Sequence, residues 1–219
     1  MSHGTRKPQP GAGDAPAGPA AARRRPPSRR AEAARELAAV DRAVYQAVAR
    51  TPTAELDGLF RRLSNAANHS LLWLGTAAGI ALLGGDRGRR AALEGVVSIG
   101  VTSATVNLGL KPLHRRRRPD RPEPDQPGVR RVAMPASASF PSGHAASAFA
   151  FAYAVGRHLP VLAVPIRVLA GGVAYSRVHC GVHYPTDVVV GSIVGAGTAA
   201  MVAAVHDRLA VPPSGREAR

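Results

Sequence analysis

The sequence predicts an all-α protein, a membrane-embedded helical bundle of about five to six core helices behind a disordered, basic N-terminal tail. Five apolar runs carry this prediction, since the only Lys, Arg, Asp or Glu within them is Arg167. A membrane helix needs about 20 residues, or about 17 at the short end, so each run alone is marginal but five in succession favour a bundle. No segment alternates apolar and polar residues as a strand does. The runs lie at residues 69–85, 95–110, 145–156, 159–175 and 188–205.

The composition of the chain changes along its length and predicts four regions. The first thirty residues hold six prolines, seven Lys or Arg and one acid, a composition that cannot bury a core. Because a membrane domain follows, we expect this tail to bind anionic headgroups, at about 1 kcal/mol for each cation near the surface. The regions are a disordered basic tail (1–30), interfacial helices (31–66), the membrane domain (67–208) and a flexible C-terminal tail (209–219).

Two amphipathic helices are predicted between the tail and the first apolar run. The first has an apolar stripe at helical spacing and ends at the Thr-Pro-Thr sequence of residues 51–53, where Thr53 can cap the second. Charges interrupt both helices, so we expect them to lie in the membrane interface and not to cross it. The stripes consist of Leu37, Val40, Val44 and Val48 in the first helix and Leu56, Leu59, Phe60 and Leu63 in the second.

The net charge of +15 and the isoelectric point near 11.6 indicate an anionic partner. Nucleic acid, an acidic membrane surface and a phosphorylated substrate all fit the charge. We expect no nucleic acid, because aromatic residues are only 4% of the chain and none of the phenylalanines interleaves with the basic runs. The single Cys180 excludes an internal disulfide and a multi-cysteine metal site, and we expect a buried apolar role for it over that of a catalytic thiol.

The first candidate motif follows the second apolar run. Lys111 closes that run, and Arg118, followed by Pro119, comes seven residues later in a proline-rich, non-helical stretch. Most of the arginines at 115–118 are expected to face solvent or lipid headgroups. Lys111 and Arg118 stand out from this charge run because they form a K-x6-R-P pair.

The second motif is Pro141-Ser142-Gly143-His144, which leads directly into the third apolar run. Ser142 is a good N-cap, and the N–H groups and positive dipole end of a helix start form an anion site. Gly143 allows a phosphate oxygen to approach the backbone, and His144 can give or take a proton nearby. A plain capped helix with an incidental histidine would have the same pattern, so this motif alone is a weak signal.

The third motif ends in His183 and Asp187. Together with His179 they have the spacing of metal ligands on one helix face, but Gly181 and Pro185 interrupt any such helix. We expect Pro185 to open the last helix, with His183 just before it and Asp187 just inside. The carboxylate can then hold one imidazole N–H, which leaves the other nitrogen free as a nucleophile. A structural role is expected for His179.

In this order the three motifs resemble the signature of the type 2 phosphatidic-acid phosphatase and vanadium haloperoxidase superfamily, and the flanking segments resemble its membrane lipid-phosphatase branch. The matching residues are Lys111 with Arg118-Pro119, Pro141-Ser142-Gly143-His144, and Ser176-Arg177 with His183 and Asp187. The resemblance implies that the phosphoryl oxygens are held by three cations, helped by a serine and a glycine backbone. These residues are Lys111, Arg118, Arg177, Ser142 and Gly143.

The resemblance also implies the roles of the remaining site residues. His183 would attack phosphorus to form a phosphohistidine and would be oriented by Asp187. His144 would protonate the leaving oxygen and then activate water for the second step. No metal and no cofactor are expected, because three cations replace a metal ion at the developing charge.

We therefore predict a multi-pass protein of the cell membrane that hydrolyses a lipid phosphate, or a (poly)prenyl phosphate or diphosphate, without a metal. The alternatives are a vanadate-dependent haloperoxidase on the same scaffold, which should be soluble and larger, and a non-enzymatic basic membrane-anchoring protein. The motifs leave the lipid head group and chain, monophosphate versus diphosphate, and the oligomeric state open.

The order of motifs and apolar runs places all three motifs on one membrane face. If only the five runs cross, the basic tail shares that face, which the positive-inside rule makes cytoplasmic. If the helix at 31–49 also crosses, the site faces outward. Charges in that helix would cost about 2.5–3.5 kcal/mol for each Asp or Arg at its centre, so we favour the cytoplasmic face.

Overall fold

The computed structural model of the protein describes Met1, residues 28–121 and residues 128–210. These residues form helices and their connections, with no strand among them, and the all-α prediction is confirmed. Nearly all of the predicted basic tail, and most of the predicted C-terminal tail, lie outside the described residues.

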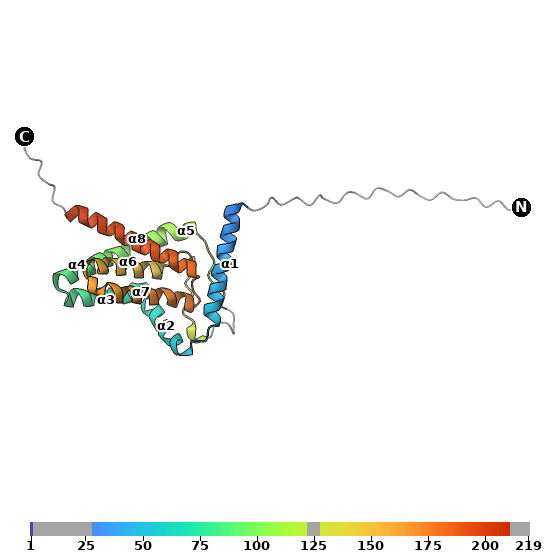
Figure 1. Cartoon of the computed structure of the whole chain (residues 1–219), viewed down its shortest axis with the longest axis horizontal. Coiled ribbons are helices and arrows are strands. Elements are labelled where there is room, and N and C mark those ends of the chain that lie inside the picture. Colours follow the sequence, from blue (N-terminus) through green and yellow to red (C-terminus); the bar gives the residue numbers. More distant parts are fainter. Residues whose placement is uncertain (2–27, 122–127, 211–219) are drawn as a thin grey trace, which may run out of the picture.

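The helices follow the order that the apolar runs predict (Figure 1). The N-terminal part contains α1 (Arg29–Arg50), α2 (Ala54–Ala66), the short η1 (Asn68–Ser70) and α3 (Leu71–Leu83). One continuous helical stretch then comprises α4 (Gly85–Ala104), a π-helical segment η2 (Thr105–Leu110) and α5 (Lys111–Leu113). The C-terminal part contains η3 (Gly128–Arg130), α6 (Gly143–His158), α7 (Pro160–His179) and α8 (Pro185–Ala210).

Fewer helices are long enough to cross a membrane than the five apolar runs predict. In the described part of the chain, Gly85–Leu113, Pro160–His179 and Pro185–Ala210 have the necessary length and hydropathy, and α2 with α3 is a fourth candidate if this pair, bent by 66°, is one span. The 16 residues of α6 extend only about 24 Å at about 1.5 Å per residue, against a hydrocarbon core of about 30 Å. With three or four such candidates, the structure is still that of a multi-pass membrane protein.

The central helix of the bundle is α6, which packs against α4, α7 and α8. Its first half is rich in alanine, and Ala145, Ala148 and Phe151 are completely buried. Small side chains at helix contacts allow close approach of the backbones, which stabilises helix pairs within membranes by van der Waals packing. The small alanine side chains of α6 thus permit tight packing of the neighbouring helices around it.

Two glycines of α8 allow it to approach the start of α6 closely. A Cβ atom placed on Gly195 would lie 2.0 Å from the carbonyl oxygen of Ala146, and one on Gly191 would lie 2.5 Å from that of Ser142. Both distances are far below van der Waals contact, and both neighbours are backbone atoms. These two glycines therefore set the spacing between α8 and the helix start that carries the second motif.

We predict that Gly195→Ala destabilises the protein by about 1–3 kcal/mol, because the new methyl group must push α8 away from α6. Gly197→Ala is the matched control on the same helix, since a Cβ atom there has no neighbour within 4 Å. Alanine favours a helix over glycine by about 1 kcal/mol, so the control should be neutral or stabilised. Thermal unfolding in detergent measures both variants, and equal midpoints would contradict the prediction.

A charged cluster joins three helices at the end of α6 that is opposite to the second motif. The buried carboxylate of Glu94 in α4 accepts hydrogen bonds from Arg157 Nε at 3.1 Å and contacts His158 Nε2 at 2.9 Å, both at the end of α6. His206 Nδ1 of α8 lies 2.9 Å from the same carboxylate. Since a charge buried within a bundle needs such partners, the cluster fixes the relative positions of α4, α6 and α8.

The first helix lies crosswise at the end of the bundle where α8 begins (Figure 1). It packs against α7 and α8, while Leu37, Val40 and Val44 of its apolar stripe remain exposed. An exposed apolar stripe is what an interfacial helix presents to lipid, and the interfacial position of α1 stays a prediction. Asp41 is one of the charges expected to keep this helix out of the membrane. It is only 2% exposed, because it lies on the side of α1 that packs against the helical bundle.

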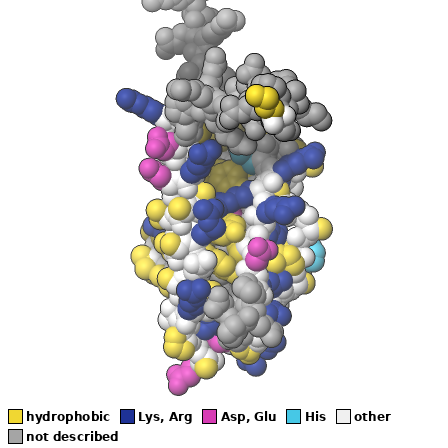
Figure 2. Space-filling view, turned by 90° about the vertical axis from the view of Figure 1, so that its right-hand side faces the viewer, with side chains coloured by type: hydrophobic (Ala, Val, Ile, Leu, Met, Phe, Trp, Pro, Cys, Tyr) yellow, Lys and Arg dark blue, Asp and Glu magenta, His cyan; other side chains and the backbone are white. Residues whose placement is uncertain are grey.

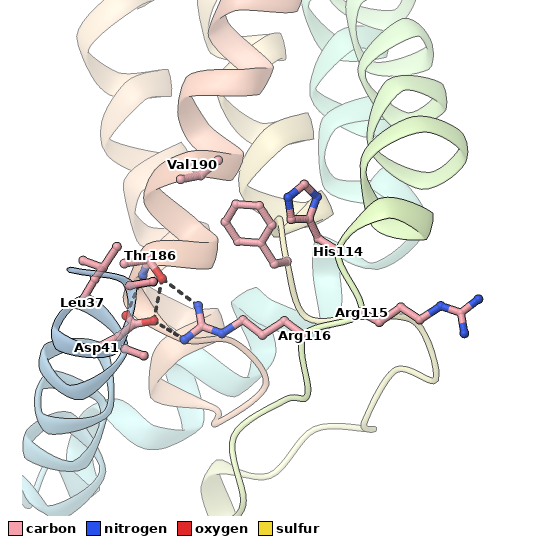
Figure 3. Close-up of a pocket in the computed structure, with 10 residues that line it drawn as sticks. Leu37, Asp41, His114, Arg115, Arg116, Thr186 and Val190 are labelled. Atoms are coloured by element: carbon pink, nitrogen blue, oxygen red, sulfur yellow. Dashed lines mark hydrogen bonds and ion pairs between the residues drawn. The ribbon is translucent and has the colours of Figure 1, made fainter. Parts of the chain in front are cut away.

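A cavity of about 540 Å³ separates part of α1 from α8 (Figure 3). Apolar side chains such as Leu37 and Val190 line it, and Asp41 and Arg116 meet at its edge. Figure 2 views this end of the molecule and shows Lys and Arg side chains gathered among hydrophobic ones.

Candidate active site

The three sequence motifs meet at the end of the bundle near α1. Lys111 lies at the end of the α4–α5 stretch, His144 in the first turn of α6, Arg177 in the last turn of α7 and His183 between α7 and α8. Each residue is thus at a helix end, as the positions of the motifs relative to the apolar runs indicate. The structure brings all three motifs to one end of the bundle, and which membrane face this end occupies stays a prediction.

A cavity of about 280 Å³ lies at this meeting point. Five of the predicted site residues line it, namely Lys111, Arg118, Gly143, His144 and His183. The other lining residues come from the junction of α2 and α3, from α4, η2 and α6, and from the segment before α6, and none of the described lining residues is acidic: Ala67, His69, Ser70, Ser103, Asn107, Pro135, Ser137 and Ser147. The remaining predicted site residues, Ser142, Arg177 and Asp187, are almost completely buried and do not line the cavity.

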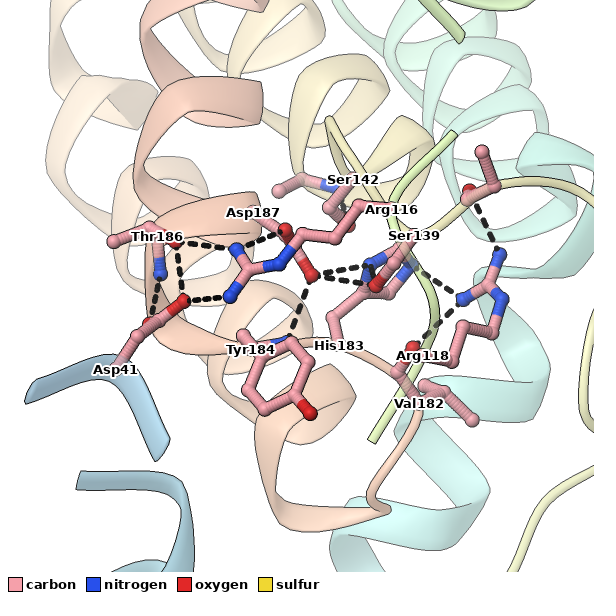
Figure 4. Close-up of polar contacts among 12 residues, drawn as sticks. Asp41, Arg116, Arg118, Ser139, Ser142, Val182, His183, Tyr184, Thr186 and Asp187 are labelled. Carbon is pink, nitrogen blue, oxygen red and sulfur yellow. Dashed lines mark hydrogen bonds and ion pairs between the residues drawn. The ribbon is translucent and has the colours of Figure 1, made fainter. Parts of the chain in front are cut away.

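The carboxylate of Asp187 lies beside the imidazole of His183, as predicted (Figure 4). Its Oδ2 atom is 3.6 Å from His183 Nδ1 and accepts a hydrogen bond of 2.6 Å from the hydroxyl of Ser139. The same hydroxyl oxygen is 3.5 Å from Nδ1. Acceptors therefore surround Nδ1, which favours the tautomer that carries its proton on this nitrogen.

The other ring nitrogen of His183 faces a donor. Arg118 Nη1 lies 3.1 Å from His183 Nε2 and also donates to the carbonyl of Val182 at 2.7 Å. A guanidinium group has only donors, so Nε2 must offer its lone pair. Burial lowers the pKa of His183 to about 4, against the opposing hydrogen bond with Asp187. At neutral pH the imidazole is therefore uncharged, with an unprotonated Nε2 that faces the cavity cations.

Neutral oxygen atoms hold the two cations that line the cavity. Lys111 Nζ donates to Asn107 Oδ1 at 2.9 Å and to Ser137 Oγ at 3.1 Å. Arg118 Nε donates to the carbonyl of Ser137 at 3.0 Å. These hydrogen bonds fix both side chains in place. Because the acceptors are neutral, they leave the positive charges free to attract an anion.

Arg177 is a third cation, and its charge acts on Lys111 and His183. It is 1% exposed, and its Nη1 atom donates to Ser64 Oγ at 2.5 Å. Its Nε–H has no hydrogen-bond partner among the described residues. A buried donor without a partner costs about 1–3 kcal/mol, so this guanidinium group favours the arrival of an acceptor such as a phosphate oxygen.

His144 is oriented by a residue that the sequence analysis missed. Its Nε2 atom lies 2.9 Å from Asn68 Oδ1. Asn68 belongs to the corner between α2 and α3, where His69 and Ser70 have positive φ angles of 52° and 59°. If Nε2–H donates to the amide oxygen, Nδ1 of His144 is the nitrogen that can exchange a proton. No motif marks Asn68, because only this tight corner brings it to the cavity.

The start of α6 has the predicted capped geometry. Ser142 Oγ accepts from the N–H of Ala145 at 3.4 Å, while the N–H of Ser142 donates to the carbonyl oxygen of Asp187 at 2.9 Å. A Cβ atom on Gly143 would lie 3.8 Å from Lys111 Nζ. The missing side chain therefore leaves room for an oxygen atom between the helix start and the ammonium group. Ser142 Oγ only accepts in this cap, so its own O–H remains available as a donor to a phosphate oxygen.

Two charged residues at the site belong to none of the three motifs. Most of the arginines at 115–118 were expected to face solvent or headgroups, but Arg116 Nη1 donates to Asp187 Oδ1 at 2.9 Å. Asp41 of α1 is buried and bonded to the same arginine. Pattern alone could not separate four consecutive arginines or predict that α1 docks at the site.

His179 and Cys180 have the structural positions that the sequence predicts. His179 Nε2 lies 3.0 Å from Asp57 Oδ1 in the interior, away from the residues that line the cavity. Cys180 is completely buried, and burial raises the pKa of its thiol. A buried thiol with a raised pKa is a poor nucleophile.

A bundle of membrane helices that presents two histidines and three cations around one small cavity defines a membrane phosphatase. Residues 91–210 match the PAP2 superfamily. The decaprenylphosphoryl-5-phosphoribose phosphatase of Mycobacterium tuberculosis (strain ATCC 25618 / H37Rv) is 40% identical over 152 residues, which are 66% of this chain and 77% of that protein. The chain therefore belongs to the PAP2 superfamily, and the family resemblance of the motifs is confirmed.

Further comparisons support this assignment. The protein of the same name from Mycolicibacterium smegmatis is 36% identical over 135 residues, 60% of this chain and 68% of that protein. The crystal structure of a transmembrane PAP2 type phosphatidylglycerolphosphate phosphatase from Bacillus subtilis superposes with a TM-score of 0.60 at 25% identity, covering 84% of this chain and 90% of the other. Aquifex aeolicus LpxE has the same fold, with a TM-score of 0.60 at 20% identity, 74% of this chain and 93% of the other.

Proposed function

We propose that this PAP2 phosphatase acts on a phosphomonoester at the head of a prenyl-linked lipid, with a polyprenyl-phosphoryl sugar phosphate as its substrate. The relatives named decaprenylphosphoryl-5-phosphoribose phosphatase support this choice, since the chain spans 77% of the Mycobacterium tuberculosis protein at 40% identity. The membrane helices and the lipid-phosphatase neighbours support a substrate that is anchored in the bilayer.

The cavity is the observation that carries the proposal. Lys111, Arg118 and the buried Arg177 supply three positive charges, and the described residues that line the cavity include no carboxylate. A phosphomonoester carries up to two negative charges, and the transition state for its transfer spreads charge over the phosphoryl oxygens. Preorganised cations in a partly desolvated site stabilise such charge strongly.

In the first step, His183 Nε2 attacks phosphorus, forming a P–N bond while the P–O bond to the lipid alcohol breaks. His144 gives a proton to the departing oxygen, so a neutral alcohol leaves. Arg118 Nη1 lies 3.1 Å from Nε2, so it must turn toward the phosphoryl oxygens when substrate binds. Asp187 holds the Nδ1–H of the imidazole and stabilises the positive charge that develops on the ring.

In the second step, His144 accepts a proton from a water molecule that attacks phosphorus. The P–N bond then breaks, His183 regains its lone pair, and inorganic phosphate leaves. The same histidine thus acts as acid and then as base, which returns the site to its starting protonation state.

Phosphate release from a panel of lipids tests the proposed function. Detergent-purified protein is incubated with decaprenylphosphoryl-5-phosphoribose, phosphatidylglycerol phosphate, phosphatidic acid and a polyprenyl diphosphate. We expect the highest kcat/KM for the first. A preference for the glycerolipids would contradict the proposed substrate but keep the phosphatase, and no release from any lipid would contradict both.

We predict that hydrolysis continues in excess EDTA and is inhibited by vanadate. The three cations take the place of a metal ion, and the described residues contain no group of three or more His, Cys, Asp or Glu side chains placed to hold one. Vanadate adopts the five-coordinate geometry of phosphoryl transfer, so the same cations should hold it. Activity that is lost in EDTA and restored by Mg²⁺ would show that the cations do not suffice.

The alternatives receive less support. A haloperoxidase would use the same cavity to hold vanadate permanently, but the relatives described above are phosphatases, and the membrane helices fit a lipid substrate. A basic membrane-anchoring protein would have no need for His144 and His183 to line one cavity with two cations.

A further inference from the structure

The first helix lies outside the residues that match the PAP2 superfamily, yet it contacts the catalytic carboxylate through a single arginine. We infer that Asp41 of α1 and Arg116 are positioning residues, which hold Asp187 in the orientation that His183 requires. The inference rests on the proposed mechanism, in which Asp187 orients the nucleophile.

The two oxygen atoms of Asp187 have different partners (Figure 4). Oδ2 faces the nucleophile: it accepts from Ser139 Oγ at 2.6 Å and from the N–H of Tyr184 at 2.9 Å, and lies 3.6 Å from His183 Nδ1. Oδ1 accepts from Arg116 Nη1 at 2.9 Å. Because Asp187 is 0% exposed, its charge needs a nearby cation, and Arg116 forms an ion pair with it. The direction of Oδ2 therefore depends on where Arg116 holds Oδ1.

Arg116 cannot hold this position through Asp187 alone, because it extends from a segment without regular secondary structure. Its Nη2 atom donates to Asp41 Oδ2 at 2.5 Å, and its Nη1 atom also donates to Thr186 Oγ1 at 2.8 Å. The guanidinium carbon lies 4.3 Å from the centre of the Tyr184 ring, within cation–π range. These contacts fix the plane of the guanidinium group, and the shortest of them comes from α1.

Asp41 forms hydrogen bonds with Thr186 at the start of α8 as well as the ion pair with Arg116 (Figure 3). Its Oδ1 atom accepts from the N–H of Thr186 at 2.9 Å, and its Oδ2 atom accepts from the Thr186 hydroxyl at 2.5 Å. A carboxylate at a helix N-terminus satisfies a free N–H and interacts favourably with the dipole. Asp41 therefore caps the turn of α8 that carries Asp187, from a helix 145 residues away in sequence.

Asp41→Asn tests the inference without a change of side-chain size. The amide can keep the acceptor for the Thr186 N–H, but it loses the charge and the lone pairs that Arg116 needs. We expect kcat to fall about 10- to 100-fold, the range typical of groups that orient a catalytic histidine from behind, with KM within about twofold. Glu36→Gln, at an exposed position of the same helix, is the matched control and should leave both constants unchanged.

A double-mutant cycle with Asp187→Asn separates positioning from a general structural role. If Asp41 acts through Asp187, adding Asp41→Asn to Asp187→Asn causes no further loss of kcat, whereas independent effects would multiply. A multiplied loss, or an Asp41→Asn variant that matches Glu36→Gln, would overturn the inference.

The tautomer of His183 gives a readout that needs no substrate. In ¹⁵N-histidine-labelled protein, with His183 assigned by its absence from a His183→Gln spectrum, we expect the Nδ1–H tautomer in the wild type and a mixture in Asp41→Asn. An unchanged spectrum would overturn the inference. A wild-type protein that hydrolyses no lipid would instead contradict the proposed function, and the ¹⁵N spectra would still decide the role of Asp41.

Discussion

We expect His183→Ala to abolish turnover, with a loss in kcat of at least about 10⁴-fold, because it removes the nucleophile of a covalent mechanism. The side chain of His183 is 2% exposed. Its Nε2 atom faces a hydrogen-bond donor, Arg118 Nη1, and therefore keeps the lone pair that a nucleophile needs. Rapid-quench experiments with radiolabelled substrate should detect an acid-labile, base-stable phosphoenzyme in the wild type and none in the variant. Retained turnover in His183→Ala would exclude the phosphohistidine mechanism.

Asp187→Asn provides the control for this experiment. It keeps the nucleophile but weakens the control of the tautomer, so we expect more residual activity than in His183→Ala. Thermal unfolding of both variants in detergent shows whether a loss of activity follows from a loss of fold. An Asp187→Asn variant less active than His183→Ala at equal stability would mean that the carboxylate itself reacts.

Arg130→Ala has the largest expected effect on stability, about 3–5 kcal/mol, because it breaks a buried ion pair and leaves the partner carboxylate uncompensated. Arg130 is 2% exposed, and its Nε atom donates to Asp57 Oδ1 at 2.8 Å. Its two terminal nitrogens donate to carbonyl oxygens at the end of α1, including Ala49 at 3.0 Å and Thr51 at 2.7 Å. The side chain thus joins α1, α2 and the segment before α6.

Thermal unfolding in detergent measures this effect. Arg89→Ala is the matched control, because the ion pair of Arg89 with Asp86 is largely exposed and such pairs contribute about 0–1 kcal/mol. Equal unfolding midpoints for the two variants would show that the ion pair of Arg130 with Asp57 does not stabilise the protein.

The sequence alone determined the helices and their caps, because these depend on residues close together in the chain. Apolar runs predict helices wherever a long stretch lacks charge, and nearly every residue of the five predicted runs is helical in the structure. The same local logic predicted Ser142 as the cap of α6 and Pro185 as the first residue of α8. Because each motif adjoins a helix end, sequence order also predicted that the motifs meet at one end of the bundle.

The apolar runs do not reveal which helix lies at the centre of the bundle. The short α6 is buried by α4, α7 and α8, so its small side chains serve close packing against three neighbouring helices. Arg130 and Asn68 gave no local signal either. Each is placed by contacts to residues more than 70 positions away.

Only the tertiary structure decided which arginine of residues 115–118 serves which role. The segment after α5 has no regular secondary structure. Within it, Arg116 and Arg118 turn toward Asp187 and His183, while Arg115 and Arg117 are exposed. The sequence determined that a basic, non-helical segment follows Lys111, but which of its arginines face the site depends on how the backbone leaves α5. That choice, together with the docking of α1, is set by long-range packing that no local pattern encodes.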